Sequence, residues 1–571
     1  MKQLGVLDSA FINLEQSNTP QHVGGLGIYD PSSAPDGFVR FKQVIANFEQ
    51  RLQRMPLFRT RLVEVPGGID RPYWVKDANF DVEFHLRHIA LPEPGDWRQL
   101  CIQVARLHAR PLDMSRPLWE AYIIEGLDNM SNLPADSFAV YTKMHHSLVD
   151  GAGGASFMAA LHDLTANPDE QPAAEEPLLV DRQPSNAELL GKASINRVKN
   201  SVKLARSSVS FASELGKYAL QVARKEVSVP DIQSPKTRFN NPVGPHRVFD
   251  AVDFPLADFK KIKDHAGVKL NDVALCIVGG AMQSYLSSKN ETPELPLAAS
   301  LPVNMRTRRG ATDDNNQVGA IFASLHSNIT DPLERLKAIH HSTIEAKEYG
   351  ETSPLVDALK IAGIFSPAVS KAAASIWSER QLSRHVPLNT STVITNVPGP
   401  NFDLYCAGAR MVQYHGMGVL TPGVGLFHTV FSQGERVNMS VLGNRDIMPD
   451  PAFYIDCLRN AYAELLQQVE RSEEKPPAAK KKVAKAPSKA PAKKASVKKT
   501  AAKKVTVKKA PTKNTLAKKP AVKKAAAKKP PAKRKASSVK PAAQKAAPKK
   551  AAASARPKAK RKIGAVAPKL R

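Results

Sequence analysis

Cysteine is scarce in this sequence. Only four cysteines occur among 571 residues, and none forms a Cys-x-x-Cys pair: Cys101, Cys276, Cys406 and Cys457. A zinc site would show closely spaced pairs of cysteines, and a small extracellular fold would show a framework of disulfide-linked cysteines. We therefore expect reduced thiols in a cytoplasmic protein, with no metal site.

Long apolar runs are also missing. The nearest candidate, residues 273–282, is far shorter than the roughly 18 residues that a membrane-spanning helix needs, and it suits a buried core helix. Asp8 stands where a signal peptide would have an apolar stretch. Any contact with a membrane is therefore expected to be peripheral.

Acidic and aromatic residues are absent from the C-terminal part of the chain. No Asp or Glu follows Glu474 and no aromatic residue follows Tyr462, whereas residues 475–571 contain 35 Lys and Arg. The whole chain has 82 basic and 53 acidic residues, so residues 1–474 keep 47 basic and 53 acidic residues, a net charge of −6. The formal charge of +29 thus belongs to a tail. Because this tail cannot bury enough apolar surface to fold, we predict that residues 471–571 are disordered.

The body is too long for one hydrophobic core, which predicts two folded domains. Strand-like and helix-like stretches alternate in residues 1–166 and 245–470, and Asp96 is placed to cap one of the helices. Pro- and acid-rich sequence opens a linker over residues 167–244. We therefore predict an α/β protein with two domains and a cleft between them.

The linker contains a basic amphipathic stretch, residues 188–226, in which apolar residues alternate with Lys and Arg. Two interpretations remain open. The stretch is either a helical connector packed on the body or an interfacial helix that lies on anionic lipid.

The segment most informative about chemistry is HHSLVDG, which contains His145, His146, Asp150 and Gly151. An alcohol is a poor nucleophile at neutral pH, and an imidazole can take its proton during attack, contributing about 10²–10⁴-fold. Adjacent residues of a strand point to opposite faces, so one histidine can face a cleft while the other faces away. Glycine permits the tight turn and the close approach of a bulky substrate. The alternative is a pair of ordinary half-buried histidines.

This segment and five further blocks resemble the bifunctional wax ester synthase/diacylglycerol acyltransferase family. That family belongs to the larger HHxxxDG acyltransferase group, which includes chloramphenicol acetyltransferase and peptide-synthetase condensation domains. The resemblance covers residues 4–468. The further blocks are LGVLDSAF from Leu4, PLW at Pro117, Leu118 and Trp119, ND at Asn271 and Asp272, and residues 302–306 and 396–400.

The resemblance implies two chloramphenicol acetyltransferase-like domains with an active-site tunnel at their interface. It implies transfer of a fatty acyl group from acyl-CoA, the co-substrate, to diacylglycerol or a long-chain fatty alcohol. His146 would be the general base, without an acyl-enzyme and without a cofactor. The alternatives are another hydroxyl acceptor, or a non-enzymatic protein that tethers lipid bodies or the nucleoid.

Loop residues around the base receive supporting roles. His145 and Asp150 are expected to hold the loop, and Gly151 to permit its turn. Arg306 is either the partner of Asp150 or a surface residue in a basic cluster. 

Three other blocks leave alternatives open. Asn271, beside Asp272, is either an oxyanion donor or a helix N-cap. Pro117, Leu118 and Trp119 are expected to line the acceptor tunnel, although Trp119 equally fits the core. One departure concerns FSQG from Phe431, where the family often has Ser-Tyr-x-Gly, and it puts the acceptor preference in question.

The tail resembles the Lys/Ala/Pro tails of linker histones and histone-like bacterial proteins. Such chains bind polyanions with little sequence preference, and both DNA and anionic lipid qualify. A solubilising extension without a partner is the remaining alternative. We expect a cytoplasmic protein that associates peripherally with the inner membrane or lipid bodies, and that residues 475–571 tether to the nucleoid or membrane.

Overall fold

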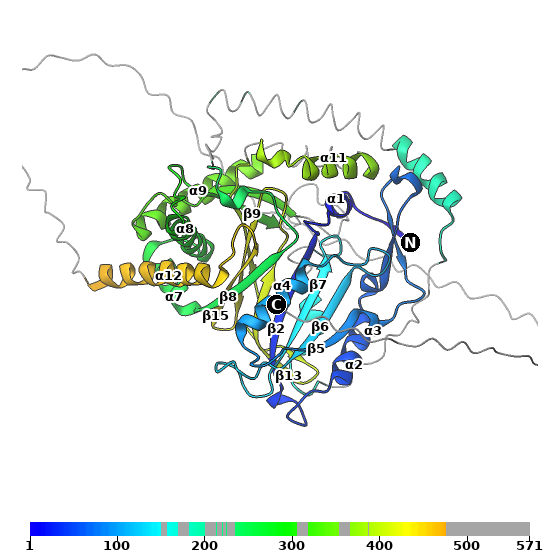
Figure 1. Cartoon of the computed structure of the whole chain (residues 1–571), viewed down its shortest axis with the longest axis horizontal. Helices are drawn as coiled ribbons and strands as arrows, with labels where there is room; N and C mark the ends of the chain where they lie inside the picture. Colours follow the sequence, from blue (N-terminus) through cyan, green and yellow to red (C-terminus); the bar gives the residue numbers. More distant parts are fainter. Residues whose placement is uncertain are drawn as a thin grey trace, which may run out of the picture. The chain divides into compact units, whose positions relative to one another are not determined.

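The computed structural model describes residues 1–149, 157–168, 182–199, 213, 220, 224, 234–304, 318–352, 366–385 and 388–474. The chain divides into two units, residues 1–480 and 481–571. The predicted tail beyond residue 474 and most of the basic stretch after residue 199 therefore lie outside the described residues. The features below belong to the first unit (Figure 1).

The first large sheet includes His145, the last residue of β7, and His146 follows directly. Its six strands lie in the order β12-β13-β2-β7-β6-β5, with β5 and β6 parallel and the other neighbours antiparallel. The strands are β2 (His22–Asp30), β5 (Leu86–Ala90), β6 (Trp119–Glu125), β7 (Phe138–His145), β12 (Tyr405–Cys406) and β13 (Ala409–Met417).

Helix α4 (Trp97–Ala109) supplies the crossover that the parallel pair β5 and β6 requires. Asp96 caps it: its side chain accepts from the N–H of Gln99 at 2.8 Å, and Gln99 Oε1 accepts from the N–H of Asp96 at 3.1 Å. This capping box satisfies two amide groups that the first turn leaves unpaired. The predicted cap at Asp96 is confirmed.

A small sheet lies beside the first. It orders β1 (Lys2–Gln3), β4 (Tyr73–Lys76) and β3 (Thr60–Val63). A helix over residues 186–199, in the linker, packs Leu189 and Ala193 on this sheet. Three other apolar side chains of that helix are exposed: Leu190, Ile195 and Val198. The described part of the basic stretch is thus attached to the body and also presents apolar side chains to solvent.

The second large sheet orders β10-β9-β11-β14-β15-β8, with β11 parallel to both of its neighbours. Its strands are β8 (Arg247–Pro255), β9 (Ala298–Asn304), β10 (Val318–Ser324), β11 (Thr392–Pro398), β14 (Leu426–Gln433) and β15 (Arg436–Asn444). Four helices gather beside it in Figure 1: α7 (Leu256–Ala266), α8 (Leu270–Ser288), α9 (Pro332–Thr352) and α12 (Pro451–Glu474). Other α-helices among the described residues are α1 (Val6–Leu14), α2 (Phe41–Leu52), α3 (Val82–His85), α11 (Pro367–Glu379) and a short helix over residues 157–161.

Helix α8 contains the apolar run at residues 273–282. Its residues from Val273 to Met282 are buried, which confirms the predicted core helix. Its first turn is closed by Asp272, whose side chain accepts from the N–H of Lys269 at 3.0 Å. Within the described ranges, no helix is long and apolar enough to cross a membrane.

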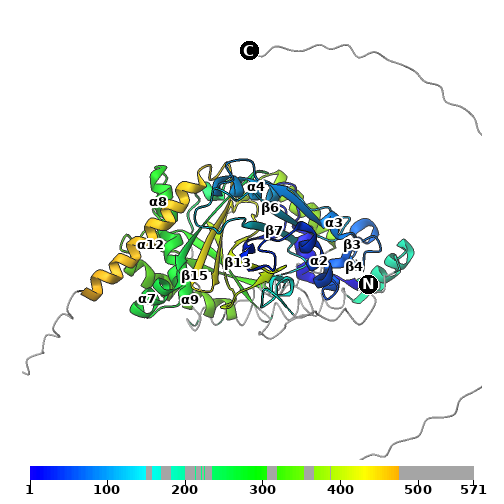
Figure 2. The same cartoon turned by 90° about the horizontal axis from the view of Figure 1, so that it is seen from below.

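Strand β13 joins the two large sheets. It comes from the C-terminal half of the sequence but pairs with β2. Beyond the short β12, side chains from the second sheet cover its outer carbonyls: Asn438 Nδ2 donates to Tyr414 O at 2.6 Å, and Ser440 Oγ donates to Gly416 O at 2.6 Å. Figure 2 shows β13 between β15 and β7.

A second joint lies at α4, which packs against β8 in one shared core. Trp97 Nε1 donates to Asp250 Oδ1 at 2.8 Å across this contact. The mixed α/β fold with two sheets confirms the predicted fold class. Residues 405–417 complete the N-terminal sheet, a pairing that no sequence pattern predicted.

Candidate active site

Two backbone hydrogen bonds fix the end of β7 at the histidine pair. His145 N–H donates to Leu118 O at 2.9 Å, and His146 N–H donates to Gln21 O at 2.8 Å. Since β2 pairs His22 with His145, the second bond continues that ladder by one residue. Strand alternation therefore still applies at His146.

The two histidines consequently lie on opposite faces of the sheet. His145 shares its face with Lys143, and His146 shares the other with Met144 and Thr142. His145 is fully buried, whereas His146 is only half-buried. The structure thus separates a buried histidine from an accessible one.

The His145 ring is held by its neighbours. Its Nδ1 accepts from the N–H of Ser147 at 3.0 Å, so the ring proton lies on Nε2. That Nε2 lies 3.4 Å from Glu15 Oε2, and Glu15 also accepts from the N–H of Gln21 at 2.5 Å. Because Gln21 O in turn accepts from His146, these contacts fix both histidines in one loop.

Helix α1 contacts the accessible histidine. The Phe11 ring stacks on the His146 ring with centroids 4.0 Å apart and an interplanar angle of 8°. Phe11 belongs to the LGVLDSAF block, so the structure brings that block to the histidine pair. The stack limits the orientations that the imidazole can adopt.

The PLW block supports the strand end and lines no part of the cavity described below. Pro117, Leu118 and Trp119 are all buried. Leu118 O accepts from His145, and Trp119 Nε1 donates to Phe58 O at 2.8 Å. Trp119 belongs to the core, the second of the two interpretations offered by the sequence.

The ND block begins α8. The N-cap is Lys269, so Asn271 lies within the first turn and is not the cap. Asn271 Oδ1 accepts from Asn396 Nδ2 at 3.4 Å, which brings two of the sequence blocks together. Asp272 is buried and accepts from His340 Nδ1 at 2.6 Å, so it ties α8 to α9. Its role is structural, while the oxyanion role of Asn271 stays a prediction.

Three candidate residues lie outside the described residues: Asp150, Gly151 and Arg306. Their predicted roles in holding and turning the loop stay predictions. The part of the chain that the structure covers contains no group of three or more His, Cys, Asp or Glu arranged for a metal ion.

The face behind His145 carries a buried polar network that the sequence analysis missed. His22 Nε2 donates to His108 O at 2.5 Å, and His108 Nδ1 accepts from Tyr141 Oη at 2.7 Å. Lys143 Nζ lies 3.3 Å from Glu120 and donates to backbone carbonyls. These residues come from β2, α4, β6 and β7, so no local pattern announces them.

Burial keeps this network uncharged at its histidines. It lowers the pKa of His108 to about 3, and that of His22 well below its ordinary value. Burial also lowers the pKa of Lys143, and Glu120 opposes that shift. The network therefore supports the strand end and offers no base that is accessible to substrate.

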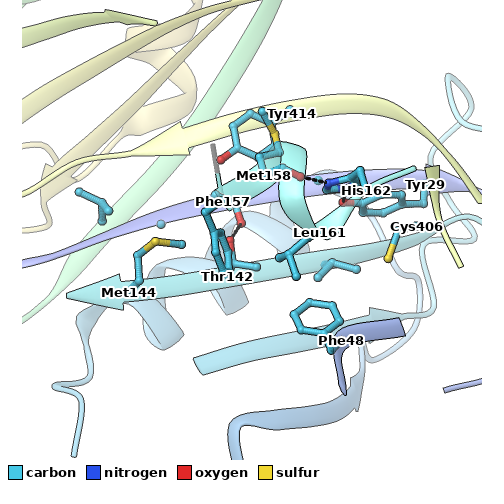
Figure 3. Close-up of a pocket in the computed structure, with 15 residues that line it drawn as sticks. Tyr29, Phe48, Thr142, Met144, Phe157, Met158, Leu161, His162, Cys406 and Tyr414 are labelled. Carbon is cyan, nitrogen blue, oxygen red and sulfur yellow. Dashed lines mark hydrogen bonds between the residues drawn. The ribbon is translucent and has the colours of Figure 1, made fainter. Parts of the chain in front are cut away.

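A cavity of about 60 Å³ lies on the other face, the face of His146 (Figure 3). β2, β7 and β13 form one wall, and residues 157–162 with Phe48 form the other. Its lining is mainly apolar: Val23, Gly24, Gly25, Gly27, Tyr29, Phe48, Val140, Thr142, Met144, Phe157, Met158, Leu161, His162, Cys406 and Tyr414. Met144 places the cavity two residues along β7 from His146.

The polar groups at the far end of the cavity satisfy one another. His162 Nδ1 donates to Met158 O at 2.5 Å, and Tyr29 Oη donates to His162 Nε2 at 2.8 Å. Burial lowers the pKa of His162 to about 4, so the ring is uncharged near pH 7. Next to it, Arg51 pairs with Asp163.

Known proteins match this chain over nearly all of its described body. The wax ester synthase/diacylglycerol acyltransferase catalytic domain matches residues 4–274, and the C-terminal domain of the same family matches residues 315–466. A Mycobacterium tuberculosis H37Rv protein provisionally named a diacylglycerol O-acyltransferase is 32% identical, covering 81% of this chain and 99% of the relative. The chain belongs to the wax ester synthase/diacylglycerol acyltransferase family.

Two further relatives support this family membership. A probable diacylglycerol O-acyltransferase from the same strain is 31% identical over 81% of this chain and 98% of its own length. The solved wax ester synthase/diacylglycerol acyltransferase from Marinobacter aquaeolei VT8 is 28% identical with a TM-score of 0.57, covering 82% of this chain and all of that one. As a member of the family the protein is an acyltransferase, which confirms the prediction from the HHxxxDG segment.

Proposed function

We propose that the protein transfers a fatty acyl group from acyl-CoA to the hydroxyl group of diacylglycerol or of a long-chain alcohol, with His146 as general base. The single observation that carries the assignment is the asymmetry of the pair. His145 is fully buried and engaged with Ser147 and Glu15, whereas His146 is half-buried on the face that holds the cavity.

The reaction proceeds through a tetrahedral intermediate. His146 takes the hydroxyl proton as the alcohol oxygen attacks the thioester carbonyl, forming the C–O bond. The C–S bond then breaks, and the leaving thiolate takes the proton from the imidazolium. Proton transfer of this kind contributes about 10²–10⁴-fold to the rate. No protein nucleophile is needed, because both substrates bind together.

Release of CoA tests the reaction and the base. Purified full-length protein is given palmitoyl-CoA with hexadecanol or with dioleoylglycerol. We expect acceptor-dependent CoA release from the wild type and a loss of about 10²–10⁴-fold in kcat for His146→Ala. His341→Ala is the matched control, because His341 lies exposed on α9. A wild type that releases no CoA with either acceptor contradicts the reaction, and a fully active His146→Ala contradicts the base.

Attachment to a lipid surface is a second part of the proposal. Helix 186–199 exposes Leu190, Ile195 and Val198 beside the basic residues Arg197 and Lys199. Apolar side chains flanked by Lys and Arg favour an interface that carries anionic lipid. Replacing Ile195 and Val198 together by Ser should reduce the fraction of protein that sediments with phosphatidylglycerol vesicles several-fold. Equal sedimentation of the variant and the wild type would contradict the attachment of this helix to lipid.

The basic tail is proposed to bind a polyanion, DNA in the first instance. Its 35 Lys and Arg without an acid would release many counterions, so binding should weaken steeply with salt. A chain ending at Glu474 should keep acyl transfer and lose retention on DNA–cellulose at moderate salt. Equal retention of both chains would contradict the tether.

A further inference from the structure

We propose that the cavity on the His146 face holds the hydrocarbon chain of one substrate, and that Leu161 limits the length of that chain. The inference rests on the proposed function, because the chain's reacting end must lie at His146.

The cavity runs along β7 from the catalytic end. Met144, Thr142 and Val140 alternate with buried residues of the opposite face, and all three line the cavity. His146 follows Met144 by two residues on the same face, just beyond this lining. Figure 3 shows Met144 near one end of this row and the Tyr29–His162 pair near the other. A linear chain whose reacting end lies at His146 therefore enters past Met144.

Two glycines of β2 shape the wall. A side chain at Gly25 would collide with the ring of Tyr414, and one at Gly27 with the ring of Tyr29. Without those side chains the two tyrosine rings lie against the sheet. The rings of Tyr29 and Tyr414 therefore cover the β2 backbone at Gly27 and Gly25 and contribute aromatic surface to this wall.

The chemistry of the lining suits methylene groups. His162 is uncharged near pH 7, its ring nitrogens are engaged with Met158 and Tyr29, and Arg51 and Asp163 neutralise each other nearby. The lining also contains the hydroxyl groups of Thr142, which donates to Gly25 O at 3.3 Å, and of Tyr414. Each methylene buried in such a site improves binding about fourfold.

The size sets a limit on the chain. A volume of about 60 Å³ is small, so the side chains that line the cavity decide how much of a hydrocarbon chain can enter. Leu161 is the last residue of the helix over residues 157–161, and its buried side chain lines the cavity between Phe48 and the Tyr29–His162 pair (Figure 3). A larger residue should shorten the preferred chain and a smaller one should lengthen it.

Three variants test the assignment: Leu161→Trp, Leu161→Phe and Leu161→Ala. The ratio of kcat/KM for palmitoyl-CoA to that for octanoyl-CoA is measured with hexadecanol fixed. A second series compares hexadecanol with octanol at fixed palmitoyl-CoA. In one of the two series we expect the ratio of kcat/KM for the C16 substrate to that for the C8 substrate to fall about tenfold or more in Leu161→Trp, and by less in Leu161→Phe. In Leu161→Ala the same ratio should stay unchanged or rise.

The series in which the ratio shifts identifies the chain as acyl or alcohol. Leu336→Ala is the matched control, since Leu336 is equally buried but lies in α9, away from the cavity. A ratio unchanged in both series, or shifted equally in both, overturns the assignment, because one cavity holds one chain. Loss of activity by the wild type would instead contradict the proposed function.

Discussion

At the scale of single residues, the two histidines of one motif have separate tasks because they are neighbours on a strand. The alternation of side chains predicted that they would face apart, and the structure places them so. Glu15 and Ser147 could not be predicted, since Glu15 reaches His145 only after α1 has packed against the end of β7. Tertiary contacts of that kind leave no local pattern.

Glu15 should act by positioning. In Glu15→Ala the N–H of Gln21 loses its acceptor, which should cost about 1–3 kcal/mol of unfolding free energy and lower kcat with little change in KM. Glu15→Gln keeps an acceptor oxygen and should restore most of kcat. Urea denaturation and steady-state kinetics measure both effects. Equal kcat for Glu15→Ala and the wild type would remove Glu15 from the positioning contacts.

Buried histidines should make the protein unstable in acid. Burial lowers the pKa of His108 and His428 to about 3 and that of His162 to about 4, whereas an unfolded histidine titrates near 6.5. Between these values the unfolded state binds more protons, so stability falls as the pH falls below about 6.5. Each histidine contributes up to about 1.4 kcal/mol per pH unit.

The urea midpoint between pH 7.5 and pH 5 measures this loss. His428→Gln should show a shallower fall than the wild type, because one titrating group is gone. His341→Ala, at an exposed position, should show the same slope as the wild type. A midpoint that is independent of pH in this range would contradict the prediction.

At the scale of elements, helices with strong local signals were predicted well. Asp96 caps α4, and the apolar run of residues 273–282 forms the core of α8. Strand β2 was not anticipated, because its sequence HVGGLGIYD has three glycines, which are unfavourable in a strand. The reason for Gly25 and Gly27 is the two tyrosine rings that lie over them, which only the tertiary structure reveals.

The side chains that cover β13 should matter for stability. Asn438→Ala and Ser440→Ala each leave a carbonyl of β13 without its donor, at Tyr414 and Gly416. Each should lower the unfolding free energy by about 1–3 kcal/mol. Asn79→Ala, at an exposed position, serves as the control and should change it by less than about 0.5 kcal/mol. If neither variant lowers the unfolding free energy by more than Asn79→Ala does, the two side chains do not stabilise β13.

At the scale of the whole molecule, the count of charged residues located the basic residues in the tail, and the alternation of strand-like and helix-like stretches predicted the α/β class. It could not predict which strands share a sheet, because pairing partners lie far apart in sequence. Ser33 Oγ, for instance, donates to Gly408 O, 375 residues later. Such contacts depend on the complete body, residues 1–474.

Neither half of the body should fold alone. A fragment of residues 1–244 lacks β12 and β13 and leaves the edge of β2 unpaired. We expect this fragment to be insoluble by itself and to become soluble, with acyl transfer restored, when residues 245–474 are co-expressed. A monomeric, cooperatively unfolding fragment of residues 1–244 would contradict this prediction.

Synthesis on the ribosome gives β13 a further importance. Between the end of β7 and the end of β13 the ribosome adds roughly 270 residues, which at about 5–20 residues per second takes tens of seconds. Throughout that interval β2 offers a free edge to any other nascent chain. The yield of soluble protein in a heterologous host should therefore depend on the supply of chaperones. Slowing translation should lower this yield by more than a lower growth temperature raises it.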